Sequence, residues 1–587
     1  MQTAMTSRLR HPSALLVAAV VLLVGWAALS AARSTPHPLE RSAALRAVFA
    51  DARAAALARG ERWTNVRVGA VDDTTTRVTF FHGARLVAEV AVTPRGTVER
   101  FSDARGRDAP YGAPLVRRPL VVAIAALAFL LATAVVPLQR IRNVDVAALL
   151  ALVVPVLLLN ERLLAASTLA ALPSLLWLTG RCLWLALGPH EGGFALRPSQ
   201  ASGLRATSQA PARPLLDVLT PSWGDGQRLR ILRFAVGVAA ACVALITISA
   251  PSTVDVAQAV MEGGTLLVHG TLPYGNMPGD VFHGDVYPLL SYAVYAPLAT
   301  VMPVHDGWDV ANGALIVAAL SAIAGAWLLA RIAGRASASA RELDRTDDAA
   351  RAAGLRAALA WLTLPPLLVT ASTGTSDVLL GALVLAALAL ARRPLASVAA
   401  VLVAGWFKVV PFALLPIWLA RLHGRRLVLG LALTAGTAAA TLVALVVLGG
   451  TSAPGQMLQA IAYQADRRTL HSPWTLLGIE WLQPLGQAAV LALVAAATVR
   501  VRRDAALAAD PMRLAALAGA VLLGLQLTGN YWTYLYLAWV VPCIVVGLLA
   551  DAPRPAPVTV AVPGLNPLRR NADVGPERIR PRAPQPS

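Results

Sequence analysis

Long apolar runs alternate with short polar or arginine-bearing stretches along most of the 587 residues of this chain. Runs of roughly 16–25 apolar residues are long enough, as helices, to cross a hydrocarbon core about 30 Å thick. Such runs occupy about residues 13–32, 119–137, 144–159, 163–187, 231–250, 312–330, 355–372, 378–391, 427–449, 485–501, 513–529 and 535–550. Together with two short segments between Arg392 and Arg426, they predict an all-α polytopic membrane protein with about 14 transmembrane segments.

Residues 34–117 depart from this pattern. Helical periodicity covers about 39–59, and apolar and polar positions then alternate in four segments, about 66–71, 77–81, 86–92 and 97–101. The pattern predicts a small α/β insert, which is similar to a PepSY-type module. Arg8 and Arg10 place the N-terminus inside, so the insert after the first span is expected on the extracytoplasmic side.

Composition divides the chain into six parts. We expect an N-terminal membrane anchor at 1–33, the α/β domain at 34–117, three transmembrane helices at 118–187, a flexible cytoplasmic linker at 188–230, a membrane core at 231–550 and a disordered cytoplasmic tail at 551–587. The first part has the basic start and apolar stretch of a signal segment. It is long enough to remain as an anchor, and Ala31-Ala32 leaves cleavage open.

One apolar stretch of the core is not assigned as a crossing. Residues 287–302 are interrupted by Pro288 and Pro297, and a crossing there would place the arginine-rich loop 331–356 outside, against the charge rule. We therefore expect an interfacial or re-entrant segment at this place. The two short segments that follow Arg393 are expected to turn near Phe407–Pro411.

Composition supports the membrane assignment, since 57% of the residues are hydrophobic, 14% are charged and the mean hydropathy is +0.61. A net charge of +19 suggests nucleic acid at first, but the arginines flank apolar runs, where membrane proteins keep cytoplasmic positive charge. We therefore predict membrane lipids and no nucleic acid as partners. Cys182, Cys242 and Cys543 lie in or beside apolar runs, which gives neither a disulfide framework nor a zinc spacing.

The predicted topology gathers polar residues on the extracytoplasmic side. They occur in the loop 251–286, the turn 373–377, the loop 450–484 and the segment 529–534. Cytoplasmic loops, by contrast, are merely basic. No glycine-rich nucleotide loop and no metalloprotease motif occurs, so a nucleotide-driven mechanism has no support in the sequence. The asymmetry predicts a site that faces outside, in a multi-pass protein of the bacterial plasma membrane.

Asp255 directly follows a predicted span and begins a predicted helix, with Ser252 or Thr253 able to cap it. A carboxylate at the membrane–water boundary can act as a general base on a sugar hydroxyl. The alternative interpretation is a helix-start residue that the helix dipole favours.

Lys408 is the only lysine in the chain and lies within an apolar stretch. An ammonium at membrane depth is costly unless it pairs or reaches water, so it indicates function, and the phosphate of a lipid carrier is a suitable partner. The alternative is an interfacial lysine that extends to water. Arg467, Arg468 and His471 could complete a cationic pocket, or could be a solvated surface group. The other candidate substrate-binding residues are Tyr274, Asp280, His283, Asp285 and Asn530.

Several of these segments resemble glycosyltransferases of the GT-C superfamily that use polyprenol-phosphate sugars, and glycosyltransferase family 87 in particular. The segments are Val254–Val256, Glu262–Gly264, His269–Gly275, Tyr287–Leu290, where Leu289 replaces the family's second proline, and Phe407–Pro411. The resemblance covers about residues 231–550. It does not account for the first four spans or for residues 34–117.

The resemblance implies an inverting transfer in which Asp255 deprotonates the acceptor and Lys408 stabilises the departing lipid phosphate. No metal ligand is assigned. The second acid that many GT-C enzymes carry in this loop would have to be Asp280 or Asp285, which leaves use of a divalent metal open.

The expected function is therefore that of an integral membrane mannosyltransferase, with a lipid-linked sugar donor and a lipid or glycan acceptor. The alternative is a secondary transporter or lipid flippase of the cell envelope, although polar residues gather in outer loops and no internal repeat is evident. For the N-terminal part, a scaffold that binds partners is a third interpretation.

Overall fold

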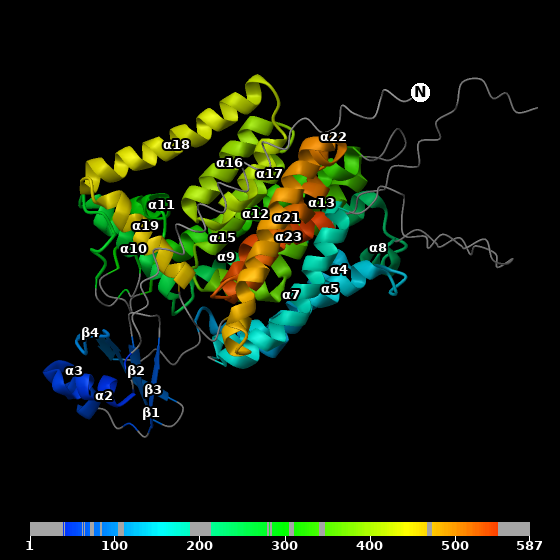
Figure 1. Cartoon of the computed structure of the whole chain (residues 1–587). Helices are drawn as coiled ribbons and strands as arrows, with labels where there is room; N and C mark the ends of the chain where they lie inside the picture. The colour runs from blue at the N-terminus through cyan, green and yellow to red at the C-terminus, as the bar shows by residue number, and fades with distance from the viewer. Residues whose placement is uncertain are drawn as a thin grey trace, which may run out of the picture.

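The computed structural model is mostly helical, with one small sheet domain at one end of a large helical body (Figure 1). The structure describes residues 39, 41–60, 63, 65–70, 76–82, 85–103, 111–161, 163–187, 213–278, 281, 284–304, 310–339, 347–466 and 472–549. The predicted first span at 13–32, most of the predicted linker and the predicted tail lie outside these residues.

The described α-helices are α2 (Arg41–Ala50), α3 (Ala52–Gly60), α4 (Pro119–Thr133), α5 (Ile141–Ala151), α6 (Val153–Asn160), α7 (Leu164–Leu187), α8 (Leu215–Leu219), α9 (Asp225–Ile248), α10 (Asp255–Val268), α11 (Leu289–Val301), α12 (Asn312–Ser339), α13 (Asp347–Thr363), α14 (Pro365–Ser372), α15 (Asp377–Ala389), α16 (Pro394–Phe407), α17 (Leu415–Ala420), α18 (Arg425–Gly449), α19 (Ala453–Asp466), α20 (Pro473–Leu476), α21 (Gln483–Arg503), α22 (Ala505–Ala509), α23 (Pro511–Thr528) and α24 (Leu537–Ile544). Short helical turns are η1 (Pro114–Arg117), η2 (Val410–Leu414), η3 (Glu480–Leu482), η4 (Tyr534–Tyr536) and η5 (Val545–Leu549). The strands are β1 (Asn65–Ala70), β2 (Thr76–His82), β3 (Arg85–Val92), β4 (Val98–Asp103), β5 (Val135–Val136) and β6 (Arg213–Pro214).

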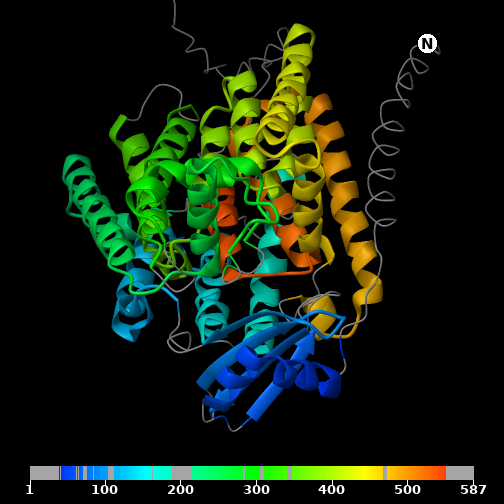
Figure 2. The ribbon, with the colours of Figure 1, turned by 90° about the vertical axis from the view of Figure 1, so that its left-hand side faces the viewer.

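The sheet domain consists of α2, α3 and an antiparallel sheet in the order β1-β2-β3-β4. The four strands predicted from alternation are confirmed to within a few residues. Alternate residues of β2 and β3, such as Val78, Phe80 and Val90, are fully buried against Ala44 and Val48 of α2. One face of the sheet is therefore covered by helices, as expected for strands in which every second residue is apolar. Figure 2 shows the domain below the helical body.

Within the described ranges, seven helical segments are long and apolar enough to cross a membrane, or eight if the bent pair α13 and α14 counts as one span. The seven are Ile141–Asn160, Leu164–Leu187, Asp225–Ile248, Asn312–Arg335, Arg425–Gly449, Glu480–Arg503 and Pro511–Thr528. Each coincides with a predicted span. The other predicted spans within the described ranges fall on shorter apolar helices or on the bent pair, so the total of about 14 crossings stays a prediction.

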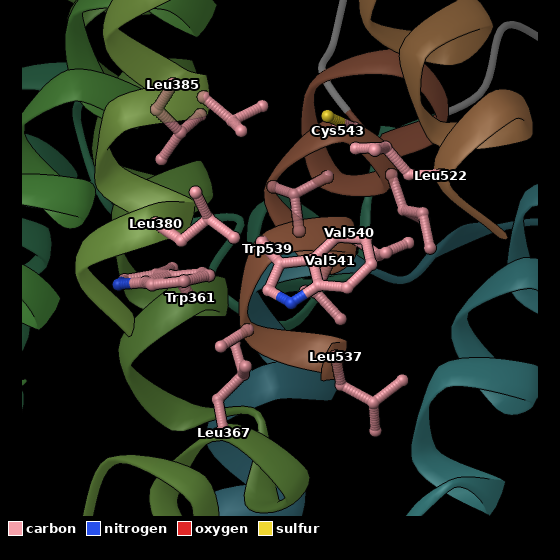
Figure 3. Close-up of a cluster of buried hydrophobic side chains, with 14 of the residues drawn as sticks. Trp361, Leu367, Leu380, Leu385, Leu522, Leu537, Trp539, Val540, Val541 and Cys543 are labelled. Carbon is pink, nitrogen blue, oxygen red and sulfur yellow. The ribbon is translucent and has the colours of Figure 1, made fainter. Parts of the chain in front are cut away.

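The helices before and after the predicted linker pack into one continuous core rather than two. Helix α23 lies at the centre of this core, and 78% of its apolar stretch is buried. In α18, by contrast, only 6% of the apolar stretch is buried. Small residues allow close approach: a Cβ on Gly519 of α23 would lie 3.2 Å from the Sγ of Cys182 in α7. Figure 3 shows part of this core, where Trp539 and Val541 of α24 lie among leucines of other helices.

Two local expectations differ from the structure. Residues 213–230, expected as the end of a flexible linker, form β6, α8 and the first turn of α9, because β6 pairs with β5. Helix α10 begins at Asp255 as predicted, but neither Ser252 nor Thr253 caps it, and Val254 is the N-cap residue. The Thr253 hydroxyl instead accepts a hydrogen bond from the backbone N–H of Ala311 at 3.2 Å.

Candidate functional site

Hydrogen bonds tie together the segments that carry the two main candidate residues. The Val254 N–H, next to Asp255, donates to the Thr373 carbonyl at 3.0 Å, which joins the start of α10 to the turn before α15. The Ser291 hydroxyl of α11 donates to the carbonyl of Phe407, the residue before Lys408. These two bonds join α10 to α15 and α11 to α16, and the bond between Lys408 and Asp377 links the two pairs.

Asp255 is the first residue of α10 and its side chain is exposed. Its Oδ1 accepts a hydrogen bond from the Val256 N–H at 2.8 Å. Free backbone N–H groups at a helix N-terminus interact favourably with a carboxylate, which explains the place of an acid at this position. An exposed carboxylate in this position can reach a substrate hydroxyl.

Lys408 ends α16 in an extended backbone conformation, and its side chain is 12% exposed. Its Nζ donates to Oδ1 of Asp377 at 2.6 Å. The ammonium also lies 5.5 Å from the ring centre of Tyr287 and 5.3 Å from that of Tyr536, within the range of cation–π attraction. A carboxylate and two aromatic rings thus surround the only lysine of the chain.

Asp377 is fully buried at the start of α15. Besides Lys408, its Oδ1 accepts from the indole Nε1 of Trp539 at 2.8 Å, and its Oδ2 accepts from the Thr375 hydroxyl at 2.7 Å. In the sequence Asp377 lies in a polar turn, and no local pattern assigned it to the site. A lysine at membrane depth needs a counter-ion, and this need was the only signal in the sequence. It does not show which acid supplies the negative charge.

Tyr287 connects the two candidate residues. Burial raises the pKa of its phenol well above the usual range, and the negative charges of Asp255 and Asp377 add to the increase. The phenol therefore stays protonated and can donate a hydrogen bond. The predicted base therefore acts on Tyr287 through its charge, and the predicted phosphate ligand lies 5.5 Å from the centre of the Tyr287 ring.

Other predicted site residues support the loop that carries Tyr287. Tyr274 is buried, and its hydroxyl donates to the Tyr287 carbonyl at 3.0 Å. Asp285 accepts a hydrogen bond from the Gly275 N–H at 3.1 Å. Both residues thus fix the fold of the loop. Asn530 lies elsewhere, after α23, where its Oδ1 accepts from the Gln483 amide.

Five further predicted site residues, Asp280, His283, Arg467, Arg468 and His471, lie outside the described residues. The described ranges contain no group of three or more His, Cys, Asp or Glu side chains arranged to hold a metal ion. The absence of a metal stays a prediction.

The segment Tyr111–Ala113, which follows the sheet domain in the chain, is attached beside the site. The Asn160 side chain bonds both the N–H and the carbonyl of Tyr111, at 3.0 and 3.1 Å. The Gly112 N–H donates to the Ser252 carbonyl, and the Ala113 N–H donates to the Ser372 hydroxyl, each at 3.2 Å. Ser252 and Ser372 precede Asp255 and Asp377 by a few residues, so the segment Tyr111–Ala113 is hydrogen-bonded to the segments that carry the site.

No family model and no curated protein sequence matches this chain. The fold is that of a mostly helical chain with several helices fit to cross a membrane. Any assignment of function therefore depends on the chemistry of the residues around Tyr287.

Proposed function

We propose that this protein is an inverting membrane glycosyltransferase of the GT-C type. It transfers a sugar, which we take to be mannose, from a polyprenyl phosphate to a lipid or glycan acceptor. The site faces outward from the bacterial plasma membrane. The observation that carries the proposal is the common neighbour Tyr287: the Lys408 ammonium lies 5.5 Å from its ring centre, and besides burial the negative charge of the exposed Asp255 is among the causes that raise its pKa.

The proposed reaction needs these two groups in separate roles. Asp255 takes the proton from the acceptor hydroxyl, and the acceptor oxygen attacks the anomeric carbon from the face opposite the phosphate. The bond between that carbon and the phosphate oxygen breaks, and both of its electrons leave with the oxygen. Negative charge therefore grows on the lipid phosphate, where a fixed ammonium lowers the barrier. The stereochemistry at the sugar inverts because the displacement takes place in one step.

The test uses the full chain in lipid nanodiscs with radiolabelled polyprenyl-phosphate mannose and a membrane lipid extract as the acceptor source. Wild-type protein should transfer label, and Asp255→Asn should reduce the rate by at least about 10²-fold, the lower range for loss of a general base. A matched control is Asp225→Asn, since Asp225 is also the first residue of a helix and is exposed. Transfer at the wild-type rate by Asp255→Asn would reject the proposed mechanism.

A secondary transporter or lipid flippase is the second candidate. The buried pair Lys408–Asp377 and the 58° bend between α13 and α14 favour it, because transporters place paired charges beside broken helices. Proteoliposomes distinguish the two candidates. Movement of a labelled polyprenyl-phosphate lipid between leaflets without sugar transfer supports the transporter, and transfer that requires Asp255 supports the enzyme.

A further inference from the structure

The pair formed by Asp377 and Lys408 is asymmetric. The carboxylate is fully buried, whereas the lysine side chain retains 12% exposure. Both carboxylate oxygens are engaged: Lys408 and Trp539 bond Oδ1, and Thr375 bonds Oδ2. A solute that approaches the pair can therefore contact the lysine side chain but not the acid.

The orientation of Lys408 depends on this acid. A lysine has a flexible four-carbon stem and acts as a point charge, so nothing in the side chain itself fixes where the ammonium lies. The rings of Tyr287 and Tyr536 border the ammonium, but ring contacts are weaker and less directional than a charge-assisted hydrogen bond. Asp377 supplies that bond at 2.6 Å, from a carboxylate that is held in place at both oxygens.

Stability alone gives little reason for such a pair. Replacing a buried ion pair by apolar side chains of similar volume is often neutral or stabilising, because both charges must be removed from water. The pair provides a fixed, partly exposed cation, which a pair of apolar side chains would not provide. The geometry of the pair is thus suited to holding a cation for a ligand.

We propose that Asp377 is the positioning residue of the anion site: it holds the Lys408 ammonium where the phosphate of the lipid donor binds. It does not touch the substrate and acts only through Lys408. Trp539 and Thr375 hold Asp377 in turn. This inference rests on the proposed function for the identity of the anion, but the placement of the ammonium by Asp377 can be tested without it.

Because Lys408 is the only lysine, an amine-acylating reagent reports on it directly. Full-length protein in nanodiscs is treated with a water-soluble acetylating reagent, and acetylation of the Lys408 peptide is followed by mass spectrometry. Asp377→Asn removes the counter-charge and frees the amine, so acetylation should be about ten- to a hundredfold faster, from the strength of hydrogen bonds to charged groups. Asp377→Glu, which keeps the charge, should remain closer to wild type. An unchanged rate in Asp377→Asn overturns the inference.

Asp145 provides a matched control for the loss of a buried carboxylate. It is also fully buried and accepts hydrogen bonds from a cation and an indole, those of Arg181 and Trp177, each at 2.9 Å. Asp145→Asn should leave the acetylation rate of Lys408 unchanged. An equal acceleration in Asp145→Asn would mean general loosening of the helical body and would overturn the inference.

If Asp377→Asn shows no cooperative thermal transition and is therefore not folded, Trp539→Phe is used in its place. This change removes one donor to Oδ1 of Asp377 and keeps the ion pair between Asp377 and Lys408. Acetylation should then be only a few-fold faster, because the lost bond holds Asp377 and the direct bond between Asp377 and Lys408 remains. An unchanged rate in this variant also overturns the inference.

A double-mutant cycle on sugar transfer tests the functional part. If Asp377 acts only through Lys408, the double variant Asp377→Asn/Lys408→Met should transfer no more slowly than Lys408→Met. Losses that multiply would show an independent role of Asp377 and overturn the inference. Absence of transfer in the wild type rejects the proposed function, while the acetylation rates still decide whether Asp377 positions Lys408.

Discussion

Substitution of Gly112 by alanine should destabilise the packing of the segment Tyr111–Ala113 against Ser372. Gly112 has φ +82°, where an L-residue costs about 1–2 kcal/mol. An added Cβ would lie 2.4 Å from the Ser372 hydroxyl oxygen and 3.1 Å from the Ser372 backbone. That hydroxyl cannot turn away without loss, because it donates to the Val369 carbonyl and accepts from the Ala113 N–H. Overpacking adds about 1–3 kcal/mol, so the total is about 2–5 kcal/mol.

Gly270 provides the matched control. It has φ +74°, and a Cβ there would have no atom within 4 Å, so Gly270→Ala should cost only the backbone part. Thermal unfolding of the detergent-solubilised chain, followed by tryptophan fluorescence, compares the two variants. Gly112→Ala should melt several degrees lower than Gly270→Ala, on the usual scale of degrees per kcal/mol. Equal melting temperatures would refute the steric argument at Ser372.

Three further predictions follow from charged groups. Lys408→Met should slow sugar transfer by about 10²–10³-fold, which is the usual loss for one group that stabilises a developing anion. A rate that falls by less than about tenfold in the radiolabel assay contradicts the role of the ammonium. Asp145→Ala should cost about 3–5 kcal/mol of unfolding free energy because Arg181 loses its counter-charge. The double variant Asp145→Leu/Arg181→Leu should be nearly neutral, and melting temperatures compare the two. The backbone N–H of Leu507 lowers the pKa of the Asp504 carboxyl, so Asp504 stabilises the fold above its unfolded pKa of about 3.9 and loses this effect as the pH falls through its lowered folded value. Asp504→Asn should therefore melt lower than wild type at pH 7. A gap that did not narrow as the pH falls from about 3.9 towards the lowered folded pKa would contradict this.

The sequence by itself determined the elements whose pattern is local. Apolar runs of spanning length predict α7, α18 and α23, and alternation predicts the four strands of the sheet domain. It also placed Asp255 at the start of a helix and Lys408 at a turn, because spans end where polar residues begin. These features depend on neighbours within a few residues, and periodicity expresses them directly.

Only the tertiary structure decided how these residues combine. Lys408 pairs with Asp377 from another helix, and Trp539, far along the chain, bonds the same carboxylate oxygen. The attachment of Gly112 beside Ser372 is equally remote in sequence. Each partner comes from a segment that looks, by itself, like any polar turn or apolar helix. Which acid satisfies a buried cation depends on how the helices pack, and packing is set by the sum of many small contacts across the molecule rather than by any local pattern.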